Sequence, residues 1–141
     1  MLSGRKRKSK RSNIRALGDP IGEFEFTSRG VTVSEPSSGG GGSLTVNYEG
    51  PATGYGFVAS TMTFTVQEAG AKGGTITANN VAWLENGDSV SGVVSGVFSS
   101  SGTNTWRVRG MVIVSDGTVL LSEGEVSLAD RTYKGKMYAW E

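Results

Sequence analysis

The sequence predicts an all-β protein, folded as one small antiparallel up-and-down barrel of about eight strands. Three observations support this fold class: short runs in which apolar and polar residues alternate, glycine-containing turn signals between the runs, and hardly any helical periodicity. A β-sandwich or jelly roll is the alternative arrangement of such strands. We expect a basic N-terminal arm over residues 1–20, disordered or extended, and the barrel domain over residues 21–141.

The individual strands follow from the alternation. Phe24 and Phe26 open the first run, and β-branched and aromatic residues fill the later ones, as strands prefer. Asn86-Gly87 and Asp116-Gly117 are the strongest hairpin signals, because these dipeptides tolerate the positive φ of tight turns. The expected strands are 22–33, 43–49, 55–67, 74–83, 88–98, 105–114, 119–127 and 131–140.

Two glycine-rich segments need an interpretation. Gly92 and Gly96 share one face of their strand, which predicts close backbone approach or strong coiling at a barrel bend. Residues 37–43, Ser-Ser followed by four glycines and a serine, are interpreted as a flexible link. This link is either a natural loop or an inserted linker.

The last two hairpins assign an inside and an outside to the barrel. Two-residue loops at Asp116-Gly117 and Ala129-Asp130 would place Glu123 opposite Lys136 and Glu125 opposite Lys134, and a one-residue slip would remove both pairs. Exposed Glu–Lys pairs cost little, so they mark the outer face. On this register the outer face also carries Val112, Val114, Leu121, Tyr138 and Trp140. The interior then receives Arg107, Arg109, Met111, Ile113, Leu120, Val126, Tyr133 and Met137.

This assignment has two functional consequences. A dense apolar patch on the outer face predicts self-association into a homo-oligomer, unless an arm segment or loop covers it. Inward-pointing Arg107 and Arg109, together with Tyr133 and Met137, suggest a lumen that captures a small apolar anion. The alternative is a buried ion pair between an arginine and a carboxylate such as Glu23.

The chain has no cysteine and no histidine, which narrows the possible chemistry. Disulfides, thiolate metal sites and catalysis by a serine–histidine or cysteine–histidine pair are excluded within the chain. Paired carboxylates such as Glu23 with Glu25 could still support acid–base catalysis. We therefore favour a protein that is not an enzyme, expect no metal and no cofactor, and keep a barrel isomerase or cyclase as an alternative.

The net charge of +1 hides a strong division. Residues 1–15 hold 7 of the 14 basic residues and no acid, so residues 16–141 carry 7 − 13 = −6. A flexible cationic arm binds polyanions by counterion release. The partner could be nucleic acid, an anionic membrane surface or the acidic body of a neighbouring copy, and a solvated tail is the alternative. The expected polyanion-binding residues are Arg5, Lys6, Arg7, Lys8, Lys10, Arg11 and Arg15.

Targeting signals are weak in this sequence. No apolar run of about 20 residues occurs, and no apolar segment follows the N-terminal charges as it would in a signal peptide. We expect no transmembrane segment and a location inside the cell (cytoplasmic, or nuclear in a eukaryote, where the arm could serve as an import signal) or in a virion.

Two parts of the chain resemble known barrels. The run from Glu123-Gly124-Glu125 through 128–131 to Tyr138-Ala139-Trp140 resembles the closing hairpin of small lipocalin-like barrels, although the lipocalin Gly-X-Trp start is missing. The glycine-spaced strands resemble allene oxide cyclase and dirigent barrels. These resemblances imply the barrel fold and no residue role. The expected function is a self-associating, non-catalytic β-barrel module whose arm contacts a polyanion, with a small-ligand-binding barrel as the second possibility.

Overall fold

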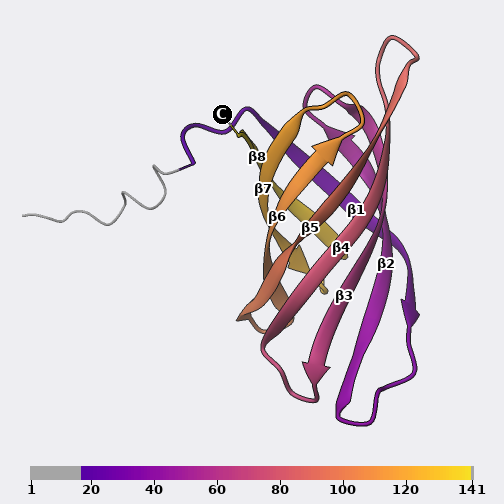
Figure 1. Ribbon diagram of the computed structural model, residues 1–141, viewed down its shortest axis with the longest axis vertical. Helices are drawn as coiled ribbons and strands as arrows, with labels where there is room; N and C mark the ends of the chain where they lie inside the picture. Colours follow the sequence, from indigo (N-terminus) through magenta and orange to yellow (C-terminus); the bar gives the residue numbers. More distant parts are fainter. Residues whose placement is uncertain (1–16, 141) are drawn as a thin grey trace, which may run out of the picture.

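The computed structural model describes residues 17–140 and confirms a closed antiparallel up-and-down barrel. Each strand pairs with the next one along the chain, and the last pairs with the first to close the barrel (Figure 1). The sandwich alternative is therefore wrong. The strands are β1 (Gly22–Val33), β2 (Gly40–Ala52), β3 (Gly56–Glu68), β4 (Gly73–Trp83), β5 (Ser89–Gly102), β6 (Thr105–Val114), β7 (Val119–Ser127) and β8 (Thr132–Ala139).

The predicted strands agree with the observed ones except at β2 and β5, which are longer. β2 begins at Gly40, because residues 40–43 continue the ladder with β3, so the prediction of a flexible link is wrong for this part. Gly41 lies so close to β3 that a Cβ there would be 2.6 Å from the carbonyl carbon of Gln67. The glycines thus permit tight strand pairing, and the turn between β1 and β2 is confined to the residues before them.

The inward-facing side chains form one apolar core. Four aromatic rings from β1, β2 and β8 meet there: the ring centroid of Tyr133 lies 4.8 Å from Phe24, 5.7 Å from Tyr48 and 6.1 Å from Phe26. Aromatic pairs at such distances each add roughly 0.5–1.5 kcal/mol beyond their area burial. The cluster joins the first and last strands, so it stabilises the seam at which the barrel closes.

Paired glycines let neighbouring strands approach closely inside the barrel. Gly96 lies opposite Gly110, and a Cβ on Gly96 would overlap the carbonyl oxygen of Arg109 and lie 2.6 Å from the Cα of Gly110. The predicted close approach is thus confirmed at Gly96. It is wrong at Gly92, where the nearest atom to an added Cβ is 3.5 Å away, an ordinary contact distance.

The turn between β6 and β7 differs from the predicted one. It has three residues, Ser115 to Gly117, because Val114 N–H donates to Thr118 O at 2.8 Å and Gly117 N–H donates to Val114 O at 2.9 Å. Gly117 adopts a φ of +95°, the left-handed conformation that closes three-residue hairpin loops. The register therefore pairs Ile113 with Val119, one residue away from the prediction.

This slip of one residue exchanges the two faces of β6. Arg107 and Arg109 are exposed on the outer surface, and Val108 and Val114 are buried in the interior. Met111 and Ile113 likewise point outward, where Ile113 is 45% exposed. The neighbouring hairpin follows the prediction, since Glu123 pairs with Lys136 and Glu125 with Lys134.

Candidate binding cavity

The barrel interior contains a cavity of about 80 Å³. Residues of all eight strands line it. The β2–β3, β4–β5 and β6–β7 turns lie at one end of the barrel (Figure 1), and the cavity is toward that end. The lumen of an eight-stranded barrel is just wide enough for side chains to fill. The cavity exists because small residues replace large ones at this level, namely Ala52, Ser60, Ala82 and Gly92.

The cavity wall is mainly apolar, with a few uncharged polar groups. Asn80 on β4 lies opposite Ser60 on β3, and both line the cavity. The Oδ1 atom of Asn80 is buried and has no hydrogen-bond partner among the described residues. A buried acceptor without a partner costs roughly 1–3 kcal/mol. The wall therefore presents an unused acceptor that a donor inside the cavity would satisfy.

Two tyrosines are the buried titratable groups of this interior. Burial raises the pKa of Tyr133, which lines the cavity, and raises the pKa of neighbouring Tyr48 to about 12. Both phenols therefore stay neutral near pH 7. The described residues that line the cavity include no carboxylate, ammonium or guanidinium group. The interior can bind by contact and hydrogen bonding, and it offers no acid–base pair poised near neutrality.

Tyr55 lies at the open end of the cavity, in the turn between β2 and β3. Burial, followed by the charge of Asp116 in the β6–β7 turn, raises the pKa of Tyr55. The Asp116 carboxylate accepts a hydrogen bond from Thr118 N–H at 3.0 Å, which lowers the pKa of Asp116. Two turns thus bring a phenol and a carboxylate near one another at the entrance.

The predicted lumen residues are only partly brought together. Tyr133 and Met137 line the cavity, whereas Arg107 and Arg109 lie on the opposite side of their strand. The prediction that the arginines face the lumen is wrong, because the β6–β7 loop has three residues where two were assumed. Arg107 forms an ion pair with Glu123 on the outer surface, so the alternative of a buried arginine–carboxylate pair is also wrong.

The arginines instead complete two rows of alternating charge across β6, β7, β8 and β1. One row runs Arg107, Glu125, Lys134 and Glu25. The other runs Arg109, Glu123, Lys136 and Glu23. Opposite charges on adjacent strands contribute roughly 0.2–1 kcal/mol per pair. The two Glu–Lys pairs foreseen from the sequence are thus the centre of a larger lattice that crosses the closing seam.

The predicted self-association patch is not assembled as expected. Val112 and Val114 line the cavity, because the faces of β6 are exchanged. Leu121, Tyr138 and Trp140 do lie on the outer side, but Tyr138 is only 8% exposed, whereas Trp140 is 57% exposed. The five residues therefore do not form one surface.

Asn80 was missed by the sequence reasoning, although a signal for it exists. Asn80 lies an even number of residues from Ile76, Ala78 and Ala82, so it shares their inward-facing side of β4. It is therefore a polar residue at an inward position where its neighbours are apolar. The polyanion-binding residues predicted in the arm, from Arg5 to Arg15, lie outside the described residues.

Residues 17–140 contain no helix long and apolar enough to cross a membrane. The same residues hold no group of three or more side chains suited to bind a metal ion. Comparison of the chain with protein-family models, curated proteins and solved structures finds no match. The cavity and the surface are thus the basis for a functional proposal.

Proposed function

We propose that this protein is a non-catalytic binding barrel whose cavity takes a small uncharged molecule, or the uncharged end of a larger one. The observation that carries the proposal is the unpartnered Asn80 Oδ1 in the apolar cavity wall. Ligand sites in proteins combine such an apolar wall with a few placed polar groups. The sequence suggested an anionic ligand, but the described lining of the cavity contains no cationic side chain to bind one. We therefore propose a neutral ligand.

The protonation state of the interior supports a binding role. Tyr133 and Tyr48 keep their protons near pH 7, and the chain has no histidine or cysteine to act as base or nucleophile. General acid–base catalysis is most efficient with a group that changes protonation near neutrality, and the described lining provides none. Binding requires only contact and the hydrogen bond to Asn80.

The volume limits the size of what enters. A buried apolar cavity of about 150 Å³ accommodates benzene with its six non-hydrogen atoms, so a cavity of about 80 Å³ accommodates roughly three to four non-hydrogen atoms. At the ceiling of about 1.5 kcal/mol per atom, such a group contributes at most about 6 kcal/mol, or a Kd of tens of micromolar. The best fit is a branched apolar group with one hydroxyl or amide donor.

The donor requirement can be tested with propan-2-ol and acetone, which are similar in shape but of which only the alcohol donates a hydrogen bond. We expect propan-2-ol to shift the amide NMR signals of Asn80 and Gly92 at lower concentration than acetone does. Asn80→Leu should abolish the preference, because it removes the acceptor. Asn79→Leu is the matched control, since Asn79 is exposed on the outer face of the same strand.

The location of the site can be tested by filling the cavity. Ala82→Leu places a larger side chain in the cavity wall, whereas Ala59→Leu places it on the outside of the neighbouring strand. Only Ala82→Leu should remove the signal shifts, provided that both variants give folded spectra. Equal shifts with the two probes in every variant, or shifts confined to outer-surface residues, would refute the proposal.

The division of charge favours a second role. The arm holds seven cations within residues 5–15, and the remainder of the chain carries −6. We propose that the arm binds a polyanion, or acidic bodies of other copies, through long-range attraction that salt screens. Self-association stays part of this proposal. One measurement of the native mass, with and without nuclease, reports both self-association and bound nucleic acid.

A further inference from the structure

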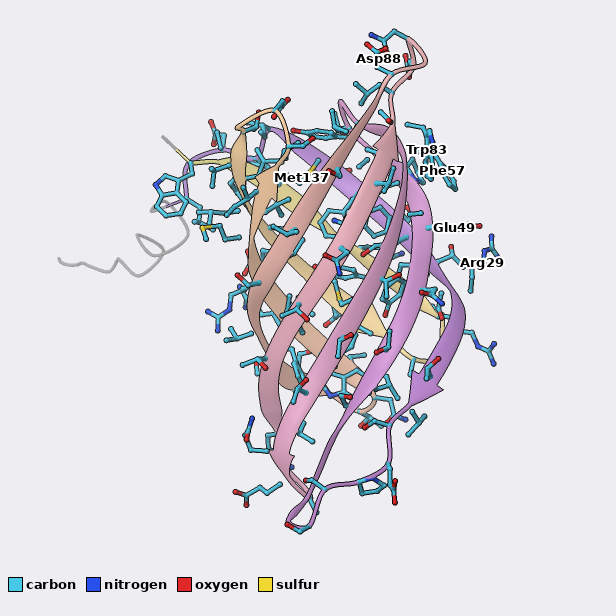
Figure 2. All side chains as sticks on the ribbon, turned by 45° about the vertical axis from the view of Figure 1, so that its right-hand side comes forward. Arg29, Glu49, Phe57, Trp83, Asp88 and Met137 are labelled. Atoms are coloured by element: carbon cyan, nitrogen blue, oxygen red, sulfur yellow. The ribbon has the colours of Figure 1, made fainter. Side chains whose placement is uncertain are left out.

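The outer surface of the barrel has two halves of different chemistry. β6, β7, β8 and β1 carry the charge lattice described above. On β2 to β5, all of whose residues the structure describes, there are two charged side chains, Glu49 and Glu68, the latter at the end of β3. Glu49 points outward from the barrel wall, and Arg29 of β1 pairs with it at 2.8 Å (Figure 2). A surface usually relies on mixed charges for solubility, so an uncharged half needs an explanation.

Two aromatic side chains stand on this uncharged half. Phe57 and Trp83 lie opposite one another on β3 and β4, with ring centroids 6.4 Å apart and ring planes tilted by 38°. They are 45% and 49% exposed, and Figure 2 shows both pointing away from the barrel. Large aromatic side chains in water usually mark an interaction site. Their relative tilt leaves parts of both rings available to one ligand.

Uncharged hydrogen-bonding side chains continue from the aromatic pair along β3 and β4 and onto neighbouring β2. We name them the hydroxyl face: Thr45, Asn47, Thr61, Thr63, Thr77 and Asn79. Thr61 donates to Asn47 Oδ1 at 3.1 Å, and the Thr45 and Thr63 hydroxyls are 3.0 Å apart. These bonds fix four of the six groups, and strand geometry spaces all six at about 4.8 Å across the strands and about 6.6 Å along them.

Strand propensity explains part of this pattern, but not all of it. Threonine is a good strand former, so the rows of hydroxyls alone have a structural explanation. Exposed Phe57 and Trp83 do not, because their burial elsewhere would be more favourable. Ala59 and Val81 lie opposite one another between the aromatic pair and the hydroxyl face, and both are smaller than the aromatic side chains beside them.

The nature of the occupant follows from the missing charges and the convex shape. A nucleic acid would meet no cation within strands β2 to β5, and Lys72 in the β3–β4 turn is a single charge that cannot neutralise a run of phosphates. A stable interface between folded proteins buries about 1,000 Å² or more over the two partners. A single chain needs only the strip of β2, β3 and β4 that carries the aromatic pair and the hydroxyl face. A polysaccharide chain is narrow, uncharged and rich in hydroxyl groups, and the C–H faces of its sugar rings stack on aromatic rings.

We propose that the outer face of β3 and β4 binds a neutral polysaccharide chain. Phe57 and Trp83 stack against sugar rings at one end, and the hydroxyl face exchanges hydrogen bonds with the sugar hydroxyl groups along the strands. This site is on the outside of the barrel and is independent of the cavity.

The test is native gel electrophoresis of the full chain in gels that contain hydroxyethyl cellulose, galactomannan or dextran, together with sedimentation with cellulose powder. We expect at least one polymer to retard the protein. Trp83→Ala should weaken that binding by about tenfold or more, as the loss of an aromatic hot spot does. Thr61→Val, which removes one hydroxyl, should weaken it several-fold. Trp83→Phe keeps a ring and should retain most of the binding.

Trp140→Ala is the matched control, because Trp140 is a similarly exposed tryptophan outside this face. It should behave as the wild type. The proposal is overturned if no polymer retards the wild type, or if Trp83→Ala and Thr61→Val bind as well as the wild type. It is also overturned if Trp83→Ala only lowers the native mass, since the face would then join two copies. Should Trp83→Ala fail to fold, Thr61→Val and Trp83→Phe decide the matter.

Discussion

Two glycines four residues apart on β5 should respond in opposite ways to the same substitution. Both face the interior, but Gly96 lies against Gly110 of β6, whereas Gly92 borders the cavity. An alanine Cβ at position 96 would overlap the Arg109 carbonyl oxygen, and at position 92 its nearest neighbour would be 3.5 Å away. Gly96→Ala should therefore destabilise the barrel, and Gly92→Ala should stabilise it.

The magnitudes follow from these contacts. At position 96 the obstacle is backbone, so β5 and β6 must separate, and overpacking of this kind costs about 1–3 kcal/mol or more. At position 92 the Cβ makes only ordinary van der Waals contacts, and replacing glycine by alanine lowers the entropy of the unfolded chain, which stabilises by about 0.4–1 kcal/mol. The two variants should differ by about 2–4 kcal/mol, or roughly 10 °C in Tm for a domain of this size.

Urea unfolding followed by circular dichroism measures the difference directly. The midpoint should fall for Gly96→Ala and rise slightly for Gly92→Ala, with the same slope in both. Equal midpoints would show that the close approach at Gly96 does not constrain the native barrel. A marked loss of stability in Gly92→Ala would show that the cavity is not open at that position, and the proposed ligand site would lose its basis.

Three further outcomes are expected. Burial raises the pKa of Tyr133 and raises the pKa of Tyr48 from 10.0 to about 12, so the folded state keeps these protons to higher pH than the unfolded state does. The free energy of unfolding should therefore be unchanged below about pH 10 and fall as the pH rises toward 12. Replacing either tyrosine by Phe should flatten this pH dependence of the urea midpoint. Glu123→Lys places like charges opposite Arg109 and should cost about 1 kcal/mol at low salt, partly recovered by adding Arg109→Glu; an unchanged urea midpoint would argue against the lattice. Deletion of residues 1–15 should abolish DNA binding, and in the intact chain the logarithm of the binding constant should fall with the logarithm of salt concentration with a slope of about −6. Light scattering with and without nuclease measures the native mass, which reports bound nucleic acid and self-association together. Salt-independent binding would contradict the arm proposal.

The strands could be predicted because their signals are local. Alternation of period two and the Asn-Gly and Asp-Gly dipeptides located all eight strands, and the Glu–Lys pairs gave the correct β7–β8 register. The β6–β7 register could not be predicted in the same way. Asp116-Gly117 suits a two-residue loop or the end of a three-residue loop, and the choice depends on tertiary hydrogen bonds. That single residue moved Arg107 and Arg109 from the lumen to the surface.

The cavity could not be predicted, for a different reason. Its volume depends on which side chains lie at the same height in the barrel. Those side chains come from all eight strands, and the stagger between neighbouring strands decides which of them meet. Gly92 illustrates the difficulty, because its spacing from Gly96 suggested a common role. The two differ only in what faces them on β6, which no local pattern records.

The seam between β1 and β8 sets the order in which the molecule can be completed. Gly22 pairs with Met137 and Thr27 with Thr132, so the partner strand of β1 at this seam is more than a hundred residues away along the chain. During synthesis, β1 to β7 can pair one after another, but the sheet keeps two open edges until β8 leaves the ribosome. The ends of the barrel are also adjacent, since Ile21 N–H donates to Met137 O at 2.8 Å. A circular permutant that joins them and opens at Gly87, in the exposed β4–β5 turn, would make the present seam a local hairpin. It would also turn the longer β4–β5 ladder into the new closing seam, so it should fold no faster than the natural order.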